Sequence, residues 1–256
     1  MGFNPKMIQI GAGSVLVKFL TGTDSTNITV TPKTGSTPTT TSFIVVTADK
    51  NKLRVGDILA LASLTSPLYT VAEASTQPRI TAIAASGSDW TITVSPAFGS
   101  APSAGSASVQ KLYNEMGATD GDIEFGGKLQ VNKQMVDQSL IAVAAVYDLL
   151  EVFLKCPFAE VSAFNISQAL GLSAQVLADT TIDLSAPSTN VAVEMRVLTV
   201  SPGPNGLTRW LMIDRAVNDS TFKLMASKTK KSIVDLTYFA LADGDNNNSI
   251  AHLLDV

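Results

Sequence analysis

The chain has 256 residues and a formal net charge of −4 at pH 7, with 45% apolar and 16% charged residues. This composition excludes wholesale disorder and argues against a broad basic surface for nucleic acid. The only cysteine, Cys156, has no internal disulfide partner, and the only histidine, His252, leaves too few ligands for a histidine-based metal site or a Ser-His-Asp triad. We therefore expect a protein that is not an enzyme and carries no cofactor or metal.

No segment of the sequence is typical of a signal peptide or a membrane span. The apolar run in residues 1–20 is broken by glycines and polar side chains, and the apolar stretch Leu140–Leu154 is interrupted by Asp148 and Glu151. A membrane-spanning helix needs about 20 apolar residues. We expect a soluble protein that is made in the cytoplasm and has no membrane partner.

The first elements in chain order are short strands. A strand is predicted around Val15–Lys18, and the threonine-rich stretch 21–42 after it is typical of a linker or a loose hairpin. Four short runs of β-branched residues then alternate with turn residues, namely Phe43–Thr47, Ile58–Leu61, Arg79–Ile83 and Trp90–Val94. Strands at this spacing predict a small all-β unit.

Segments with the composition of flexible linkers lie on both sides of this unit, namely the threonine-rich stretch before it and a Ser/Ala/Gly/Pro tract, 99–108, after it. We infer a small inserted β module, 38–110, that interrupts a larger domain made of residues 1–37 and 111–256. Residues 43–109 contain four acidic and four basic residues, so the net charge of −4 comes from the rest of the chain.

A polar segment follows the module. Residues 122–125 predict a short strand, and residues 126–139 are polar and loop-like, which favours a long mobile hairpin arm. The polar side chains that mark this arm are Lys128, Gln130, Asn132, Lys133, Gln134, Asp137 and Gln138. We treat them as the candidate contact residues of the chain.

The clearest two-residue period lies in residues 146–158 and predicts a strand with one buried face. The apolar positions of that face are Leu150, Val152, Leu154, Cys156 and Phe158. Glu151 and Lys155 fall on the opposite face. A short helix is predicted over residues 162–171, because Ser162 can cap its first amides and Gly171 can end it.

The rest of the chain predicts strands and a tail. The expected strands are Val191–Val200, Leu207–Val217, Thr221–Ala226 and Ser232–Leu241. Residues 201–206 contain Pro-Gly-Pro-Asn-Gly, a strong turn signal between the first two of these strands. Residues 243–256 form the tail.

Short motifs add little chemistry. The run Asp243–Asn247 begins like a calcium loop, but the sixth position is Asn248 and the twelfth is Leu254 where such a loop has Gly and Glu. Cys156 lies on an apolar strand face, where a thiol is usually a small core residue. Trp90 and Trp210 are expected in the core rather than on a sugar-stacking surface.

The order of these pieces resembles bacteriophage tail tube proteins, the major tail proteins. The resemblance covers residues 1 to about 30 and about 111 to 256, and it leaves out the inserted module. It rests on the alternating strand together with the phrases Val15–Lys18, Met116–Gly121, Val136–Ser139, Ala159–Gly171, Leu236–Asp243 and Ile250–Asp255.

The resemblance implies a mainly β fold, a tail-tube-type β sandwich or barrel with one short packed helix, to which the chain adds its small all-β module. It also implies hexameric rings that stack into a hollow tube in the virion tail. DNA would pass through that tube without specific binding during ejection into the host. The implied partners are further copies of the chain and other tail proteins, such as tape measure, terminator, and baseplate or tip proteins.

Physical arguments agree with this implied role. Unpaired sheet edges would be satisfied by neighbouring subunits, and the polar arm would become ordered on contact with adjacent rings. An acidic or neutral lumen lets DNA slide, because few phosphates are neutralised. The near-neutral module would lie outside the tube, since it does not fit a channel only wide enough for duplex DNA. An exposed module slightly favours a non-contractile tail.

Two other classes of function remain open from the sequence. A capsid decoration or head-closure protein would explain the composition equally well, and it would stay monomeric or trimeric in isolation. A carbohydrate-binding β protein with Trp90 or Trp210 as a stacking surface would bind its ligand as a monomer. A glycoside hydrolase with two carboxylates is the weakest alternative.

Overall fold

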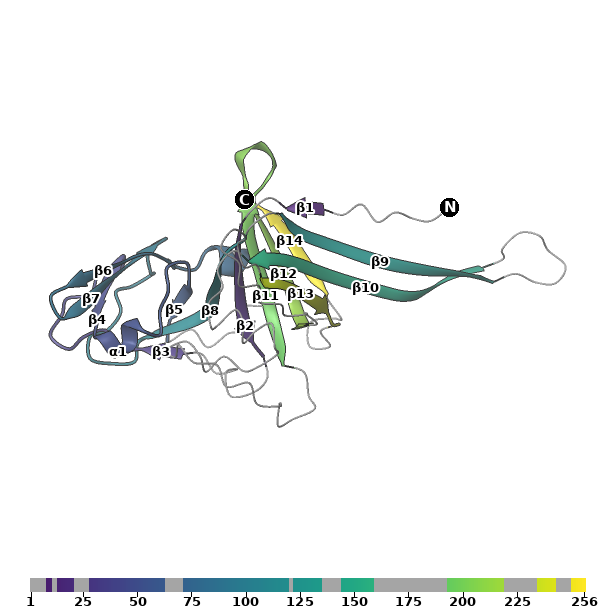
Figure 1. Cartoon of the computed structure of the whole chain (residues 1–256). Helices are drawn as coiled ribbons and strands as arrows, with labels where there is room; N and C mark the ends of the chain where they lie inside the picture. The colour runs from purple at the N-terminus through teal and green to yellow at the C-terminus, as the bar shows by residue number, and fades with distance from the viewer. Residues whose placement is uncertain are drawn as a thin grey trace, which may run out of the picture.

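A computed structural model describes residues 8–10, 13–20, 28–62, 71–119, 122–134, 144–158, 193–218, 234–242 and 250–256. The described chain is mainly β, as the sequence predicts, and its strands form one antiparallel network (Figure 1). The strands are β1 (Ile8–Ile10), β2 (Ser14–Phe19), β3 (Ile28–Val30), β4 (Ser42–Val45), β5 (Ile58–Leu61), β6 (Arg79–Ser86), β7 (Asp89–Ser95), β8 (Val109–Ala118), β9 (Ile123–Gln134), β10 (Ala144–Phe158), β11 (Glu194–Pro202), β12 (Thr208–Asn218), β13 (Val234–Ala240) and β14 (Ala251–Asp255). Short helical turns are α1 (Thr47–Lys50), α2 (Val71–Ser75) and η2 (Pro204–Gly206).

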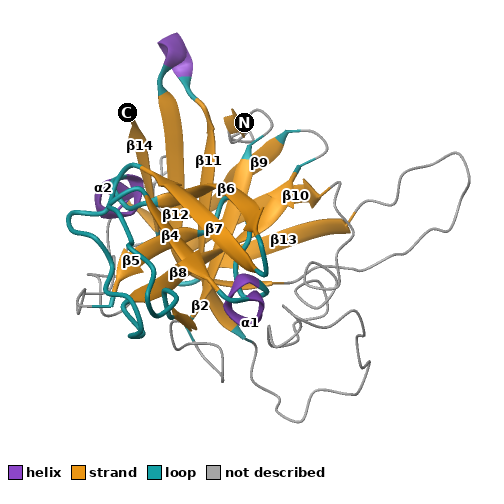
Figure 2. Cartoon of the chain, turned by 90° about the vertical axis from the view of Figure 1, so that its left-hand side faces the viewer, coloured by secondary structure: helices purple, strands orange, loops and turns teal. Residues whose placement is uncertain are grey.

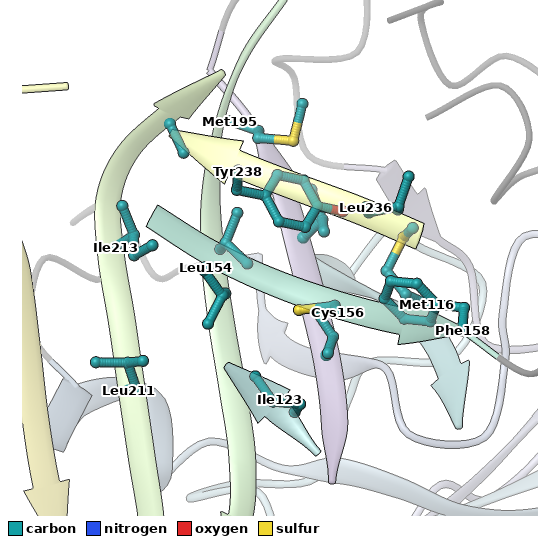
Figure 3. Close-up of a cluster of buried hydrophobic side chains, with 14 of the residues drawn as sticks. Met116, Ile123, Leu154, Cys156, Phe158, Met195, Leu211, Ile213, Leu236 and Tyr238 are labelled. Atoms are coloured by element: carbon teal, nitrogen blue, oxygen red, sulfur yellow. The ribbon is translucent and has the colours of Figure 1, made fainter. Parts of the chain in front are cut away.

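One group of strands, which we call the body, encloses the main core. Within the body the strand order is β9-β10-β13-β12-β11-β2-β8, with β1 beside β9 and β14 beside β12. The strands curl so that side chains of β10 and β13 meet those of β2, β11 and β12 in a single apolar cluster (Figure 3). A bridge between Thr119 and Phe158 brings the end of β8 to β10, but the described sheet does not close.

The alternating strand of the sequence is β10, and its predicted faces are confirmed over its last residues. Leu154, Cys156 and Phe158 are fully buried, whereas Glu151 and Lys155 are exposed. The turn at residues 201–206 is also confirmed, because it joins β11 to β12 in an antiparallel hairpin. The two-residue period of β10 follows from burial of one of its faces by the core.

A second group of strands, which we call the small unit, consists of β3 to β7 and the first half of β8 (Figure 2). All four strands predicted between residues 43 and 94 are present, with a Gly87-containing turn between β6 and β7. Its own core is lined by the following residues: Val30, Phe43, Val45, Leu53, Leu59, Ile80, Ile92, Val94, Phe98 and Val109. Strand β3 lies inside the threonine-rich stretch, so the linker prediction is wrong at 28–30.

The small unit and the body share a strand rather than a linker. The first half of β8 pairs with β3 and β5, and the second half pairs with β2. The junction at residue 110 therefore lies inside continuous β structure, and the prediction of a soft tether at this end is wrong. A third apolar cluster, which includes Ile58, Tyr113 and Trp210, packs β5, β8 and α2 against β11 and β12.

Several predicted elements lie elsewhere than expected or outside the described residues. The helix predicted over 162–171, the strand over 221–226 and the calcium-like run at 243–247 all fall outside the described residues. The sequence predicts one helix, but the described part contains the short helices α1 and α2. The tail contains a strand, β14, which pairs with β12.

Candidate assembly surfaces

A long two-stranded ribbon leaves the body (Figure 1). It consists of residues 127–134 of β9 and 144–152 of β10, which pair in antiparallel register from Gly127 opposite Val152 to Gln134 opposite Ala144. At about 3.3 Å per residue, eight residues of β9 extend about 26 Å. A register shift between Tyr147 and Leu149 interrupts the pairing and is typical of a bulge that adds twist.

The ribbon carries most of the candidate contact residues. Those on β9 are Lys128, Gln130, Asn132, Lys133 and Gln134. Asp137 and Gln138 lie outside the described residues. The prediction of a loop over residues 126–139 is wrong for 126–134, which form a regular strand, although the expected hairpin geometry is present. Lys128 is exposed and lies directly opposite Glu151, which is also exposed.

Both outer edges of the ribbon lack a neighbouring strand within the described chain. Strand β1 pairs with β9 only as far as Phe125, and β13 pairs with β10 only from Phe153 onward. The backbone N–H and C=O groups that point outward from 127–134 and 144–152 therefore meet no described strand. Such edges are templates for pairing with another chain, and a lone two-stranded hairpin is at best marginally stable in water.

The base of the ribbon is tightly packed. A Cβ added to Gly126 would lie 2.6 Å from Cζ of Phe153, so only glycine fits there without moving that ring. The ring of Phe153 in turn packs against Phe239 of β13, with the two ring centroids 6.4 Å apart. The ribbon thus starts from a fixed point on the body.

Buried charges lie where the small unit meets the second half of β8. The carboxylate of Asp57 is fully buried, with its Oδ2 3.6 Å from Nζ of Lys111. It accepts hydrogen bonds of 2.8 Å each from the backbone N–H groups of Arg54 and Glu115. Burial raises the pKa of Asp57 and lowers the pKa of Lys111, and in each case it outweighs the attraction between the two groups. This pair fixes the loop before β5 to the middle of β8.

A second ion pair lies beside the first and borders a cavity. The guanidinium of Arg79 donates to Oε2 of Glu115 at 2.9 Å, to Oγ of Ser14 at 2.8 Å and to the carbonyl of Gly56 at 2.8 Å. Burial raises the pKa of Glu115 to about 7, although Arg79 opposes the shift. These residues line a cavity of about 1000 Å³ between β6 and the β11–β12 hairpin.

The structure places the cysteine, the two tryptophans and the histidine in packing contacts or in contacts between strands. Cys156 is fully buried, and burial raises the pKa of its thiol. Trp210 is buried in the cluster between the two units, as expected, whereas Trp90 is partly buried beneath Nζ of Lys50, 4.8 Å from the ring centroid. Nε2 of His252 lies 2.9 Å from the buried carboxylate of Asp214 and ties β14 to β12.

No group of three or more potential metal ligands occurs among the residues that the structure describes. The same residues include no helix that is both long and apolar enough to cross a membrane. Comparisons of the chain with models of protein families, with curated proteins and with solved structures found no match.

Proposed function

We propose that this chain is a structural subunit that assembles into stacked rings, forming a hollow tube of the kind found in bacteriophage tails. The observation that carries the proposal is the ribbon, with its two outer edges unpaired in the described chain. No strand of the described residues pairs with these edges, and in this proposal another molecule supplies the missing strands. Further copies of the same chain are the partners that an assembling tube supplies.

Strand addition between copies of the chain is compatible with a ring. Strand addition gives affinity through main-chain hydrogen bonds, independently of side-chain chemistry. If the ribbon of one copy meets a different surface on the next copy, the contact is heterologous, and heterologous contacts close into rings or extend as filaments. The ribbon is fixed at Gly126 to the body, so each copy would present it in the same direction.

The charges near the ribbon base fit a conduit that does not hold DNA. Among the residues of β10 whose side chains the structure describes, 151–158, the exposed charged ones are Glu151 and Lys155, and the chain as a whole has a net charge of −4. A channel with few lysine and arginine side chains neutralises few phosphates, so counterion release contributes little affinity for DNA. In this account the small unit stays outside the channel.

The proposal is tested by negative-stain electron microscopy of the purified protein over a range of concentrations. We expect hollow rods or stacked rings for the natural chain. A variant in which Asn-Gly replaces residues 130–149 joins Leu129 to Leu150, which are register partners, through a two-residue turn. We expect this variant to unfold cooperatively like the natural chain and yet to form no rods.

The same experiment separates the proposal from its alternatives. A natural chain that stays monomeric or trimeric at every concentration contradicts the tube and favours a decoration or head-closure role. Rods that form equally well without residues 130–149 contradict the role of the ribbon.

A further inference from the structure

A second unpaired edge lies on the small unit, along strand β6. Strand β7 pairs with β6 over its whole length, from Arg79 opposite Ser95 to Ser86 opposite Asp89. On its other side β6 meets β5 only at its first residues, where the N–H of Ile80 donates to the carbonyl of Asp57 at 3.0 Å. From Thr81 to Ser86 no strand of the described chain covers this side.

This edge lacks the devices that usually prevent edge pairing. Natural edge strands are commonly protected by lysine, by proline or by a charged side chain that points inward. Between Arg79 and Asp89 the sequence contains no charged residue and no proline. The exposed residues of β6 are small and uncharged, namely Thr81, Ala82, Ala84, Ala85 and Ser86. A strand that approaches the edge from Thr81 to Ser86 meets no charge, and the one large side chain there, Ile83, is partly buried against the core of the small unit.

The start of the edge borders the cavity of about 1000 Å³ described above. Val55 and Leu207, two of the large apolar side chains that the described chain exposes, lie on its wall. The charged groups there, Arg79 and Glu115, already pair with each other at 2.9 Å. An arriving strand therefore finds apolar contacts beside the edge and no uncompensated charge.

The β6 edge and the ribbon lie at opposite ends of the molecule (Figures 1 and 2). A single copy cannot bring them together, because the ribbon is fixed at its base to the far side of the body. Contact between the two is therefore intermolecular and head-to-tail, the arrangement that propagates. The lengths agree: the six residues Thr81–Ser86 extend about 20 Å, and β9 of the ribbon extends about 26 Å.

We propose that the ribbon of one copy adds as a further strand to the β6 edge of the next copy. This inference rests on the proposed function and names the surface that receives the ribbon. A third strand supplies what a two-stranded ribbon needs for stability. The ribbon carries both an amine, Lys128, and a carboxylate, Glu151. An edge without charged side chains repels neither of them.

Chemical cross-linking tests this contact. One variant carries Ala84→Cys, a second carries Gln130→Cys with an affinity tag, and the two are mixed before a short bis-maleimide is added. The native Cys156 is buried and stays unreactive. We expect a mixed dimer that exceeds either homodimer at least tenfold. Ala104→Cys, on an exposed loop of the small unit, replaces Ala84→Cys in the control mixture and gives no such excess.

A blocking variant completes the test. Ala84→Lys places a charge on the edge, and we expect it to raise the concentration needed for rods at least tenfold, while Ala104→Lys leaves that concentration unchanged. Rods from the natural chain without the mixed cross-link overturn this inference and leave the proposed function standing. A dominant Ala84→Cys homodimer overturns it too, because β6 would then pair with β6 of a second copy. A natural chain that never assembles overturns the proposed function itself.

Discussion

The junction between the small unit and the body contrasts with the ribbon, although both are antiparallel β structure. At the junction, the first half of β8 has neighbours on both sides, and Lys111 of β8 is buried against Asp57. In the ribbon, β9 and β10 pair only with each other among the described strands, and Lys128 and Glu151 face solvent. The junction is thus paired within one chain, whereas in our proposal a neighbouring copy supplies the strands that the ribbon lacks. The proposal therefore assigns rigidity to the junction and assembly to the ribbon.

Removal of the buried amine should give the largest effect. In Lys111→Met the carboxylate of Asp57 loses its partner, and we expect the free energy of unfolding to fall by about 3–5 kcal/mol. Urea denaturation measures the change. Lys52→Met is the matched control, because Lys52 forms an exposed pair with Asp49 worth less than about 1 kcal/mol. Equal small losses in both variants would contradict a junction held by a buried charge pair.

The pH dependence of the free energy of unfolding should report the ionisation of Glu115. Its pKa rises from 4.5 in the unfolded chain to about 7 in the folded one, so between these values the folded state keeps a proton that the unfolded state releases. The contribution of Glu115 to the free energy of unfolding, about 3 kcal/mol, is therefore fully present below pH 4.5 and is lost as the pH rises through 7. Urea denaturation from pH 4.5 to 7.5 should show a shallower decline for Glu115→Gln, because the amide does not titrate.

The exposed Glu73 provides the control for that measurement. Glu73→Gln should keep the decline of the natural chain, since this side chain lies on the solvent side of α2. A decline that is the same in Glu115→Gln and in the natural chain would rule out Glu115 as its source.

At the ribbon base, Gly126→Ala should destabilise the chain by about 1–3 kcal/mol, because the new Cβ must displace the ring of Phe153. Thermal unfolding measures the loss. Gly99→Ala should be neutral, since nothing lies within 4 Å of its added Cβ. A neutral Gly126→Ala would mean that the ribbon base is loosely packed.

The smallest effect should come from the ribbon surface. Lys128→Glu places two carboxylates opposite each other at Glu151, a cross-strand repulsion of about 0.5 kcal/mol. Light scattering should show an assembly threshold raised about twofold. The double variant Lys128→Glu with Glu151→Lys restores the opposite charges and should restore the threshold. Failure of that rescue would show that the two side chains do not interact.

The sequence predicted the strands that bury one face. In β10, Leu154, Cys156 and Phe158 are buried and Lys155 is exposed, because the body core covers one side of the strand. Strands β11 and β12 are instead buried on both faces, so their apolar runs predicted strands without alternation. The β9 half of the ribbon was predicted as a loop because residues 126–134 are polar and show no apolar period, whereas the β10 half falls largely within the predicted strand 146–158.

The junction was missed for a different reason. The Ser/Ala/Gly/Pro tract at 99–108 ends one residue before β8 begins, so its composition gave no sign that Val109 starts a strand shared by both units. The pairing of Asp57 with Lys111 joins positions far apart in the chain. The unpaired edge of β6 follows from the structure alone, because β5 begins only at Ile58 and so pairs with no residue of β6 beyond its start. The short helices α1 and α2 contain too few residues to show a helical period.

Hydrogen exchange of backbone amides at increasing protein concentration tests the central claim most directly. In dilute protein, amides of residues 128–134 should exchange quickly while those of β8 are protected. In concentrated protein the ribbon amides should become protected as well, with β8 unchanged. Ribbon amides that exchange at the same rate at every concentration would contradict the account.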